Sequence, residues 1–350
     1  MRKLLTGWLL FTLMWLVHAA TLETSFAIPE LLWHQPFQAQ LIDSLVLVSS
    51  PHARWIYAFT PEGQALWKRQ LEWPIGEVVR IDQGVLLVHG PDARAEAIRL
   101  DTGERLLRQP RLRPAWVTPR LQDASQPDWL ALTPEGRLQS WDPHWNPSGE
   151  LGRLSLPRQD AWWGPPVELP WGVFAGSFRG QLQQWTPQKV YIHTQLDHPL
   201  MPLLAHPQGV VQISQDGRLL FQGKNRFWLA DFPGQTQCYN GRGELIARPC
   251  WDQQGNLYLA HAKGLISWSA DGALRWQTSL HCSSAPATSQ GQVVVVEAER
   301  SLAFLDAGTG QQLGQQPLPA AAGPQLSLDS RRIAVALRDH RVLVLDHWRR

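Results

Sequence analysis

The sequence predicts an all-β fold, an eight-bladed β-propeller of four-stranded antiparallel blades. Turn signals and apolar runs repeat with a period of about 40 residues, the length typical of one such blade. The position that ends the third strand of each unit is apolar except at Gln222, and it recurs at Phe59, Leu100, Trp141, Trp185, Gln222, Trp268, Leu305 and Leu345. A proline that opens each unit recurs at Pro36, Pro74, Pro114, Pro166, Pro202, Pro249, Pro286 and Pro324. Both markers give a count of eight blades.

The clearest unit lies within residues 264–318. Ile266–Trp268 and Leu274–Thr278 are expected to form a hairpin around Asp271-Gly272, because Asp-Gly tolerates the positive φ angles of a tight turn. The run Val293–Val296 follows. Four β-branched residues in succession indicate a strand that is covered on both faces, where no polar alternation is needed.

The same pattern of short apolar runs and turn residues places strands in the other blades. These are expected at Val46–Val48, Ile56–Phe59, Leu66–Arg69, Val85–Val88, Glu96–Leu100, Arg105–Arg108, Trp129–Leu132, Leu138–Trp141, Val173–Ala175, Leu182–Trp185, Val210–Ser214, Arg218–Gln222 and Arg226–Ala230. An insertion, Pro233–Gly243, separates the fifth blade from the sixth.

The last blade lacks an outer strand. It has predicted strands at Arg332–Ala336 and Arg341–Leu345, after which the chain ends without a return strand. Near the N-terminus, Leu31–Gln35 resembles the return strands of other blades and has no hairpin partner. We therefore expect Leu31–Gln35 to pair with Arg341–Leu345 and close the ring, which removes two open sheet edges. The alternative is that Leu31–Gln35 is a solvated tail.

The N-terminus has the pattern of a secretory signal peptide. Arg2 and Lys3 precede the apolar stretch Leu4–Val17, which is short for a membrane span. Small or tolerated residues allow cleavage after Ala19 or as late as Ala27, and a retained anchor is the alternative. We expect a periplasmic protein without a lipid-acceptor cysteine after the apolar stretch, with residues 1–19 as signal, 20–29 as linker and 30–350 as propeller.

Charge and motifs exclude several classes of function. The formal net charge is +2, from 32 basic and 30 acidic residues, and basic residues never run longer than a pair, so a nucleic-acid partner is not expected. The sequence has no nucleophile elbow, phosphate-binding loop or metal-ligand spacing among its 12 histidines. We therefore expect no catalytic residue, metal or cofactor.

Three stretches carry a family resemblance. AIRLDTGERLL at 97–107, AFLDAGTGQQL at 303–313 and AFTPEGQALW at 58–67 resemble the A-x-D-x-x-T-G-x-x-x-W repeat of pyrroloquinoline-quinone-like propellers. The resemblance implies that the terminal tryptophan, present at Trp67 and Trp276, packs on the neighbouring blade, and that the Thr-Gly turn sets the hairpin. These roles are structural, so the motif argues for the fold and not for the function.

This family has a catalytic and a non-catalytic branch. Quinoprotein dehydrogenases hold the quinone with Ca²⁺ and usually stack an adjacent Cys-Cys pair on it, whereas the three cysteines here are separate. The chain is more similar to the non-catalytic, BamB-type branch of outer-membrane assembly factors. The resemblance implies a monomeric scaffold that binds envelope proteins, with the outer-membrane assembly machinery as a candidate partner. A quinone-dependent oxidoreductase or a propeller that senses a small ligand is the alternative.

Two sets of residues are candidates for contact and crosslinking. Arg111, Arg113, Trp162 and Trp163 lie in connections between blades, and Arg and Trp are typical anchors of protein–protein contacts. The alternative for the two tryptophans is that they cap the central channel or pack between blades. Export favours disulfides, and a Cys238–Cys250 bridge across the turn-rich insertion is expected. Cys250–Cys282 and three free thiols remain open.

Overall fold

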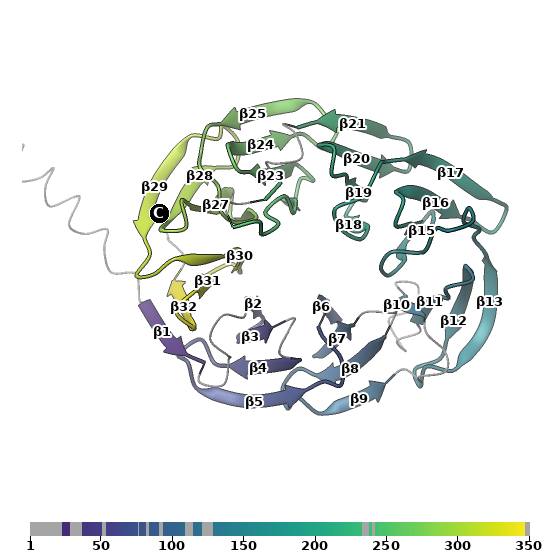
Figure 1. The fold of residues 1–350 in the computed structure, drawn as a ribbon, viewed down its shortest axis with the longest axis horizontal. Coiled ribbons are helices and arrows are strands. Elements are labelled where there is room, and N and C mark those ends of the chain that lie inside the picture. Colours follow the sequence, from purple (N-terminus) through teal and green to yellow (C-terminus); the bar gives the residue numbers. More distant parts are fainter. Residues whose placement is uncertain are drawn as a thin grey trace, which may run out of the picture.

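The computed structural model describes residues 23–28, 37–50, 54–75, 77–81, 84–90, 94–108, 115–120, 129–232, 238–239 and 242–346. All helical or extended secondary structure in this part of the chain is β-strand. The strands form eight separate four-stranded antiparallel sheets. The sheets follow one another around a closed ring (Figure 1). The predicted eight-bladed propeller is confirmed. Among the described residues, no helix has the length and apolar character needed to span a membrane.

Within each blade the strands run from the ring axis outward, in chain order except in the last blade. Blades one and two contain β2 (Gln38–Ile42), β3 (Leu45–Ser50), β4 (Trp55–Phe59), β5 (Ala65–Gln70), β6 (Glu77–Ile81), β7 (Val85–His89), β8 (Ala95–Arg99) and β9 (Arg105–Arg108). Blades three and four contain β10 (Trp116–Pro119), β11 (Trp129–Leu132), β12 (Arg137–Trp141), β13 (Pro147–Arg153), β14 (Val167–Leu169), β15 (Gly172–Gly176), β16 (Gln181–Trp185) and β17 (Val190–Gln195).

The second half of the ring repeats this arrangement. Blades five and six contain β18 (Leu204–His206), β19 (Gly209–Ile213), β20 (Arg218–Gly223), β21 (Phe227–Asp231), β22 (Cys250–Trp251), β23 (Leu257–His261), β24 (Gly264–Trp268) and β25 (Leu274–Thr278). Blades seven and eight contain β26 (Ala287–Ser289), β27 (Gln292–Glu297), β28 (Ser301–Asp306), β29 (Gln312–Pro317), β30 (Ala322–Leu328), β31 (Arg332–Leu337), β32 (Arg341–Asp346) and β1 (Glu23–Ala27).

The hydrophobic core is divided among the gaps between blades. Each of its eight clusters joins side chains from two neighbouring blades. In β27, Val293 and Val295 pack toward blade six, while Val294 and Val296 pack toward blade eight. Successive side chains of a strand point to opposite faces, so a middle strand buried on both faces needs a continuous apolar run. The interpretation of residues 293–296 is confirmed.

In three blades, a tryptophan on the outer strand packs against a glycine of the next blade. A methyl group at Gly103, where φ is +70°, would lie 2.6 Å from the ring of Trp67, so only glycine allows this close approach. The Trp67 Nε1–H also donates to the Leu100 carbonyl at 2.9 Å. The same ring-on-glycine packing recurs at Trp228 with Gly272 and at Trp276 with Gly310. The packing role implied by the family resemblance is confirmed, with Trp228 as an added example.

The ring closes through the N-terminal strand, but not through the residues expected. The outer strand of blade eight is β1, which pairs with β32 from Glu23 opposite Leu345 to Ala27 opposite Arg341. The prediction of Leu31–Gln35 as this partner is wrong, because β32 already lies between β1 and β31; residues 31–35 themselves lie outside the described part. The stretch 20–29, expected to be a linker, therefore contains a strand of the propeller.

Chain length explains the correction. The first innermost strand begins at Gln38. A closing strand at 31–35 would leave only three residue steps between residue 35 and Gln38, which reach at most about 11 Å. The crossing from the outer to the innermost position spans three strand spacings, or about 14 Å. A strand that ends at Ala27 leaves enough chain for this crossing. In β1, Phe26 lies against Phe59 of blade one, with ring centroids 4.8 Å apart, and takes the place that tryptophan has elsewhere, over Gly63.

Candidate protein-binding site

One face of the ring is formed by the connections between blades and by the turns between second and third strands. We call it the connector face. Three of the described connections are held in place, because one residue in each forms a single antiparallel bridge to the end of the second strand of the next blade. These bridges join Trp162 to Ser177, Pro199 to Ser214 and Cys282 to Glu297. In these three connections, the bridge fixes which side chains point into the protein.

The two tryptophans predicted as contact residues have different surroundings. Trp162 is 6% exposed and belongs to the core cluster between blades three and four. Its predicted role in partner contact is not supported, and inter-blade packing accounts for it. Trp163 is half-buried at the surface. Because neighbouring residues in an extended chain point to opposite sides, the inward position of Trp162 places Trp163 outward.

Trp163 has an exposed aromatic neighbour. Phe178 lies in the turn after β15, is 58% exposed, and its ring centroid lies 5.1 Å from that of Trp163. We call Trp163 and Phe178 the aromatic pair. Phe178 is not among the contact residues predicted from the sequence. A usable signal was present, since a large aromatic between Ser177 and Gly180 occupies the tip of a tight turn, where solvent exposure is expected.

Main-chain hydrogen bonds hold the aromatic pair in place. The Trp163 N–H donates to the Gly176 carbonyl at 2.9 Å, and the Phe178 N–H donates to the Ala161 carbonyl at 2.8 Å. The Asp160 carboxylate accepts the N–H of Arg179 at 3.1 Å and thereby ties the connection to the turn. A rigid aromatic pair loses little conformational entropy when a partner covers it.

Exposed arginines lie next to the aromatic pair on the connector face. Arg158 and Arg179 are both exposed and lie in the segments that carry the aromatic pair. Aromatic residues and arginine are enriched in the centres of protein–protein interfaces. The predicted contact residues Arg111 and Arg113 lie outside the described residues.

The end of the connection between blades five and six, at Arg242 and Glu244, is anchored on the same face by ion pairs. Arg338 in the turn of blade eight binds both carboxylate oxygens of Glu244, with Nη1 to Oε1 at 3.0 Å. Arg242 donates from Nε to Glu299 of the blade-seven turn at 2.8 Å. The side chains of Arg338, Glu244 and Glu299 are only 20–25% exposed, and paired Arg–carboxylate geometry is more stabilising there than in open solvent.

The predicted disulfide is absent from the structure. All three cysteines are free thiols. Cys238 lies in the core cluster between blades five and six, whereas Cys250 and Cys282 lie at the gap between blades six and seven. Blade six thus separates Cys238 from Cys250. Burial raises the pKa of Cys238 to about 11 and that of Cys282 to about 12, which suppresses thiolate formation.

Register also separates Cys250 from Cys282. Cys250 is close enough to Thr288 for a side-chain hydrogen bond, and Thr288 stands opposite Val293 of β27. Cys282 stands opposite Glu297, four residues further along β27, or about 13 Å. A disulfide requires Cα atoms within about 7 Å.

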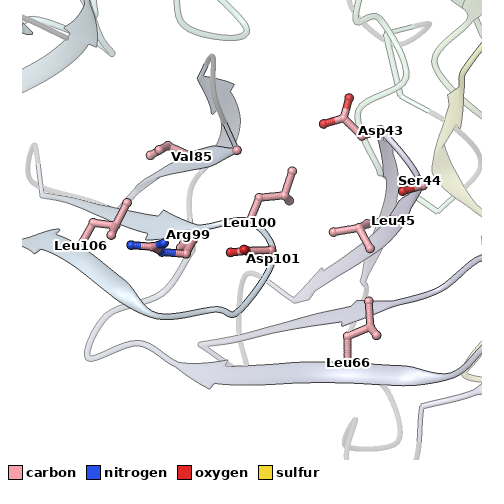
Figure 2. A pocket seen from close by; sticks show the side chains of 10 residues that line it. Asp43, Ser44, Leu45, Leu66, Val85, Arg99, Leu100, Asp101 and Leu106 are labelled. Atoms are coloured by element: carbon pink, nitrogen blue, oxygen red, sulfur yellow. The ribbon is translucent and has the colours of Figure 1, made fainter. Parts of the chain in front are cut away.

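The opposite face has a groove between blades one and two, with a volume of about 590 Å³. Its lining residues are Asp43, Ser44, Leu45, Leu66, Gly84, Val85, Arg99, Leu100, Asp101 and Leu106. Leu66 and Leu106 are 44% and 37% exposed, so the groove is open to solvent. Figure 2 shows Asp43 and Arg99 at opposite ends of it. Small-ligand sites instead have a few convergent polar groups inside an enclosed apolar cavity.

The described residues do not fit a quinone–calcium site. No group of three or more His, Cys, Asp or Glu side chains within the described ranges is arranged to hold a metal ion. On the innermost strand of blade four, the buried carboxylate of Glu168 is neutralised by Arg120, with Nε to Oε1 at 3.3 Å. Each cysteine lies singly between blades, so no adjacent pair is available to stack on a quinone ring.

Comparison with known proteins agrees with the predicted resemblance. The family model described as outer membrane protein assembly factor BamB matches residues 209–347, which run from the second strand of blade five to the end of blade eight. The predicted resemblance to pyrroloquinoline-quinone-like, BamB-type propellers is thereby confirmed. No curated protein sequence matches the chain.

Solved structures show the same fold. The crystal structure of BamB from Moraxella catarrhalis is 13% identical, with a TM-score of 0.59, and the match covers 93% of this chain and 99% of that one. The computationally designed Ika8 protein is 15% identical, with a TM-score of 0.61, and the match covers 88% of this chain and 95% of that one. At this level of identity the likeness concerns the fold alone. A designed protein with the same fold illustrates that the fold does not determine function.

Proposed function

We propose that this protein is a periplasmic, non-enzymatic scaffold that binds other envelope proteins through its connector face. The observation that carries the proposal is the aromatic pair, Trp163 and the 58% exposed Phe178, held in a hydrogen-bonded frame. Exposed aromatic residues that are already rigid in the free protein are typical of binding hot spots.

A role in outer-membrane protein assembly is the finer part of the proposal. It is supported by the family description that matches blades five to eight and by the fold shared with a solved BamB. The protein is proposed to act as a monomer, since all eight blades complete their own four-stranded sheets within one chain.

Export is proposed to involve cleavage after Ala19 and not after Ala27. Cleavage after Ala27 would remove all of β1, whereas cleavage after Ala19 leaves the closing strand intact. Sequencing of the N-terminus of the protein recovered from the periplasmic fraction tests this. A mature chain that begins at Ile28, or a protein confined to the cytoplasm, would contradict the proposal.

The scaffold proposal is tested by affinity capture from envelope extracts. The wild-type protein is compared with the double variant Trp163→Ala/Phe178→Ala and with the control Leu274→Ala, which truncates a 62% exposed side chain on the outer rim. Loss of two hot-spot side chains should weaken partner binding by a factor of about 30 or more. An identical set of retained envelope proteins with all three baits would refute a binding role for the aromatic pair.

The absence of catalysis is tested separately. The purified protein is supplied with pyrroloquinoline quinone and Ca²⁺, and oxidation of alcohols and sugars is followed with an artificial electron acceptor. Because the described residues offer no set of donors for the ion, we expect rates at the level of the protein-free control. Turnover clearly above that level would favour a quinone-dependent oxidoreductase instead.

A further inference from the structure

The outer strands of the blades differ in how their free edges are protected. Natural sheets discourage pairing with other chains by charged residues, proline, glycine or a β-bulge at the edge strand. Of the eight outer strands that the structure describes, six have a register shift against the third strand of their blade. The two without one are β1 and β21.

The main-chain groups on the free edge of β21 can be identified from its register. Hydrogen bonds from Gly223 N–H to the Arg226 carbonyl, at 2.8 Å, and from Phe232 N–H to the Gly217 carbonyl, at 2.7 Å, bracket the β20–β21 ladder. Hydrogen-bonded and non-hydrogen-bonded pairs alternate in an antiparallel ladder. Trp228 and Ala230 therefore bond to β20.

The remaining residues of β21 direct their N–H and C=O groups away from the blade. These residues are Phe227, Leu229 and Asp231. The side chains of Phe227 and Leu229 are 50% and 46% exposed, and Asp231 is also exposed. By the same rule, the outward residues of β1 are Glu23, Ser25 and Ala27, a polar and small set. Only β21 combines an unbulged edge with large apolar side chains beside it.

The strand is also rigid. On its inner side the Trp228 ring stacks on Phe221, with centroids 5.4 Å apart and an angle of 15° between the rings, and packs over Gly272 of blade six. A preorganised edge needs little ordering before another strand can add to it.

We propose that β21 is a docking edge for an extended segment of another polypeptide, which adds as a fifth, antiparallel strand to blade five. Main-chain hydrogen bonds to Phe227, Leu229 and Asp231 would hold the segment, and alternate apolar side chains would cover Phe227 and Leu229. Charge sets its direction. Exposed Asp231 at the end of β21 favours a basic residue at the segment's N-terminal side, and exposed Arg226 at the start favours an acidic residue at its C-terminal side.

This inference rests on the proposed scaffold function for its biological meaning, because it names the kind of client: an extended, apolar-alternating β-strand segment. It concerns a different surface from the aromatic pair. Failure of one proposal therefore leaves the other standing, provided that the two surfaces are altered separately.

The test uses the purified protein and the peptide acetyl-Lys-Thr-Val-Thr-Val-Glu-amide, with the charge-reversed peptide acetyl-Glu-Thr-Val-Thr-Val-Lys-amide as control. Residue-resolved amide hydrogen exchange is the readout. In the free protein, the amides of Trp228 and Ala230 should be protected and those of Phe227, Leu229 and Asp231 should exchange fast. Excess peptide should slow exchange at the latter three. Absence of this protection, or stronger protection by the charge-reversed peptide, would overturn the antiparallel docking edge.

Edge variants complete the test. Phe227→Lys/Leu229→Lys places charges beside the edge, and Leu229→Pro removes an N–H that bonds no other strand of the blade. Each should weaken peptide binding by at least about tenfold. Leu274→Lys on the bulged strand β25 is the matched control and should bind as the wild type does. Undiminished binding by both folded edge variants would overturn the assignment to β21, and capture through the aromatic pair should be unaffected by either.

Discussion

The contribution of β1 to stability can be measured with the double variant Phe26→Ala/Ile28→Ala. Phe26 is half-buried against Phe59, and Ile28 is 2% exposed in the cluster between blades eight and one. Truncation of a buried isoleucine costs about 3 kcal/mol, and the half-buried phenylalanine about 2 kcal/mol. Together the two substitutions should lower the free energy of unfolding by about 5 kcal/mol.

The corresponding change in melting temperature follows from the size of the protein. An unfolding entropy of about 2.1 cal/mol/K per residue, over about 320 residues, gives about 0.7 kcal/mol/K and a decrease in Tm of about 7 °C. Calorimetry of the mature protein measures this. The control is Ser25→Ala on the same strand, whose exposed side chain accepts one long hydrogen bond from Arg341 at 3.5 Å, and it should change Tm by less than about 1 °C.

Two results would refute this reasoning. One is a Tm of the double variant within about 2 °C of the wild type, since the closing strand would then contribute almost nothing. The other is a larger loss of stability when residues 31–35 are replaced by a Gly-Ser linker, since the closing strand would then lie where the sequence pattern first placed it.

Three further predictions concern other parts of the ring. Burial lowers the pKa of His89 to about 4, so between pH 6.5 and 4 the unfolded chain binds a proton that the folded protein does not bind. The free energy of unfolding should therefore fall by up to about 3 kcal/mol as the pH falls through this window. In His89→Gln, the free energy of unfolding measured by denaturation should depend less on pH over the same window. Gly103→Ala combines a positive φ with a clash against Trp67 and should lower the free energy of unfolding by about 3 kcal/mol. Gly84→Ala has a φ of +76° but no atom within 4 Å, and should lower it by about 1 kcal/mol. Equal losses of stability in urea denaturation would contradict the contact of the Trp67 ring with Gly103. A thiol reagent should leave the buried Cys238 and Cys282 unmodified in the native protein and should modify all three cysteines after unfolding. A disulfide-linked peptide in a non-reducing map would disprove the free-thiol assignment of Cys238, Cys250 and Cys282.

Much of the fold is determined locally by the sequence. Each hairpin depends on residues close in the chain: a turn such as Asp271-Gly272 and apolar runs of strand length on either side. The apolar run Val293–Val296 by itself predicts a strand that is buried on both faces, and no distant residue is needed for this prediction. Because these local signals recur eight times, the number of blades and the approximate strand positions follow from the sequence alone.

The candidate sites depend on contacts that no local pattern contains. Trp162 and Trp163 are adjacent and chemically identical, and only the bridge of Trp162 to Ser177 determines which of them is buried. Cys238 and Cys250 are close in sequence, but blade six separates them.

Ring closure and the open edge are decided in the same way. The sequence predicts that the last blade takes its outer strand from the N-terminus, and the position of β1 confirms this. Which stretch supplies it depends on the distance from the outer to the innermost position, and on the fit of Phe26 over Gly63. Which residues of β21 direct their N–H and C=O groups to the free edge likewise depends on the alternation of hydrogen-bonded and non-hydrogen-bonded pairs in the β20–β21 hairpin. Local chemistry therefore specifies each blade, whereas the distances and the register of the assembled ring specify which side chains face a partner.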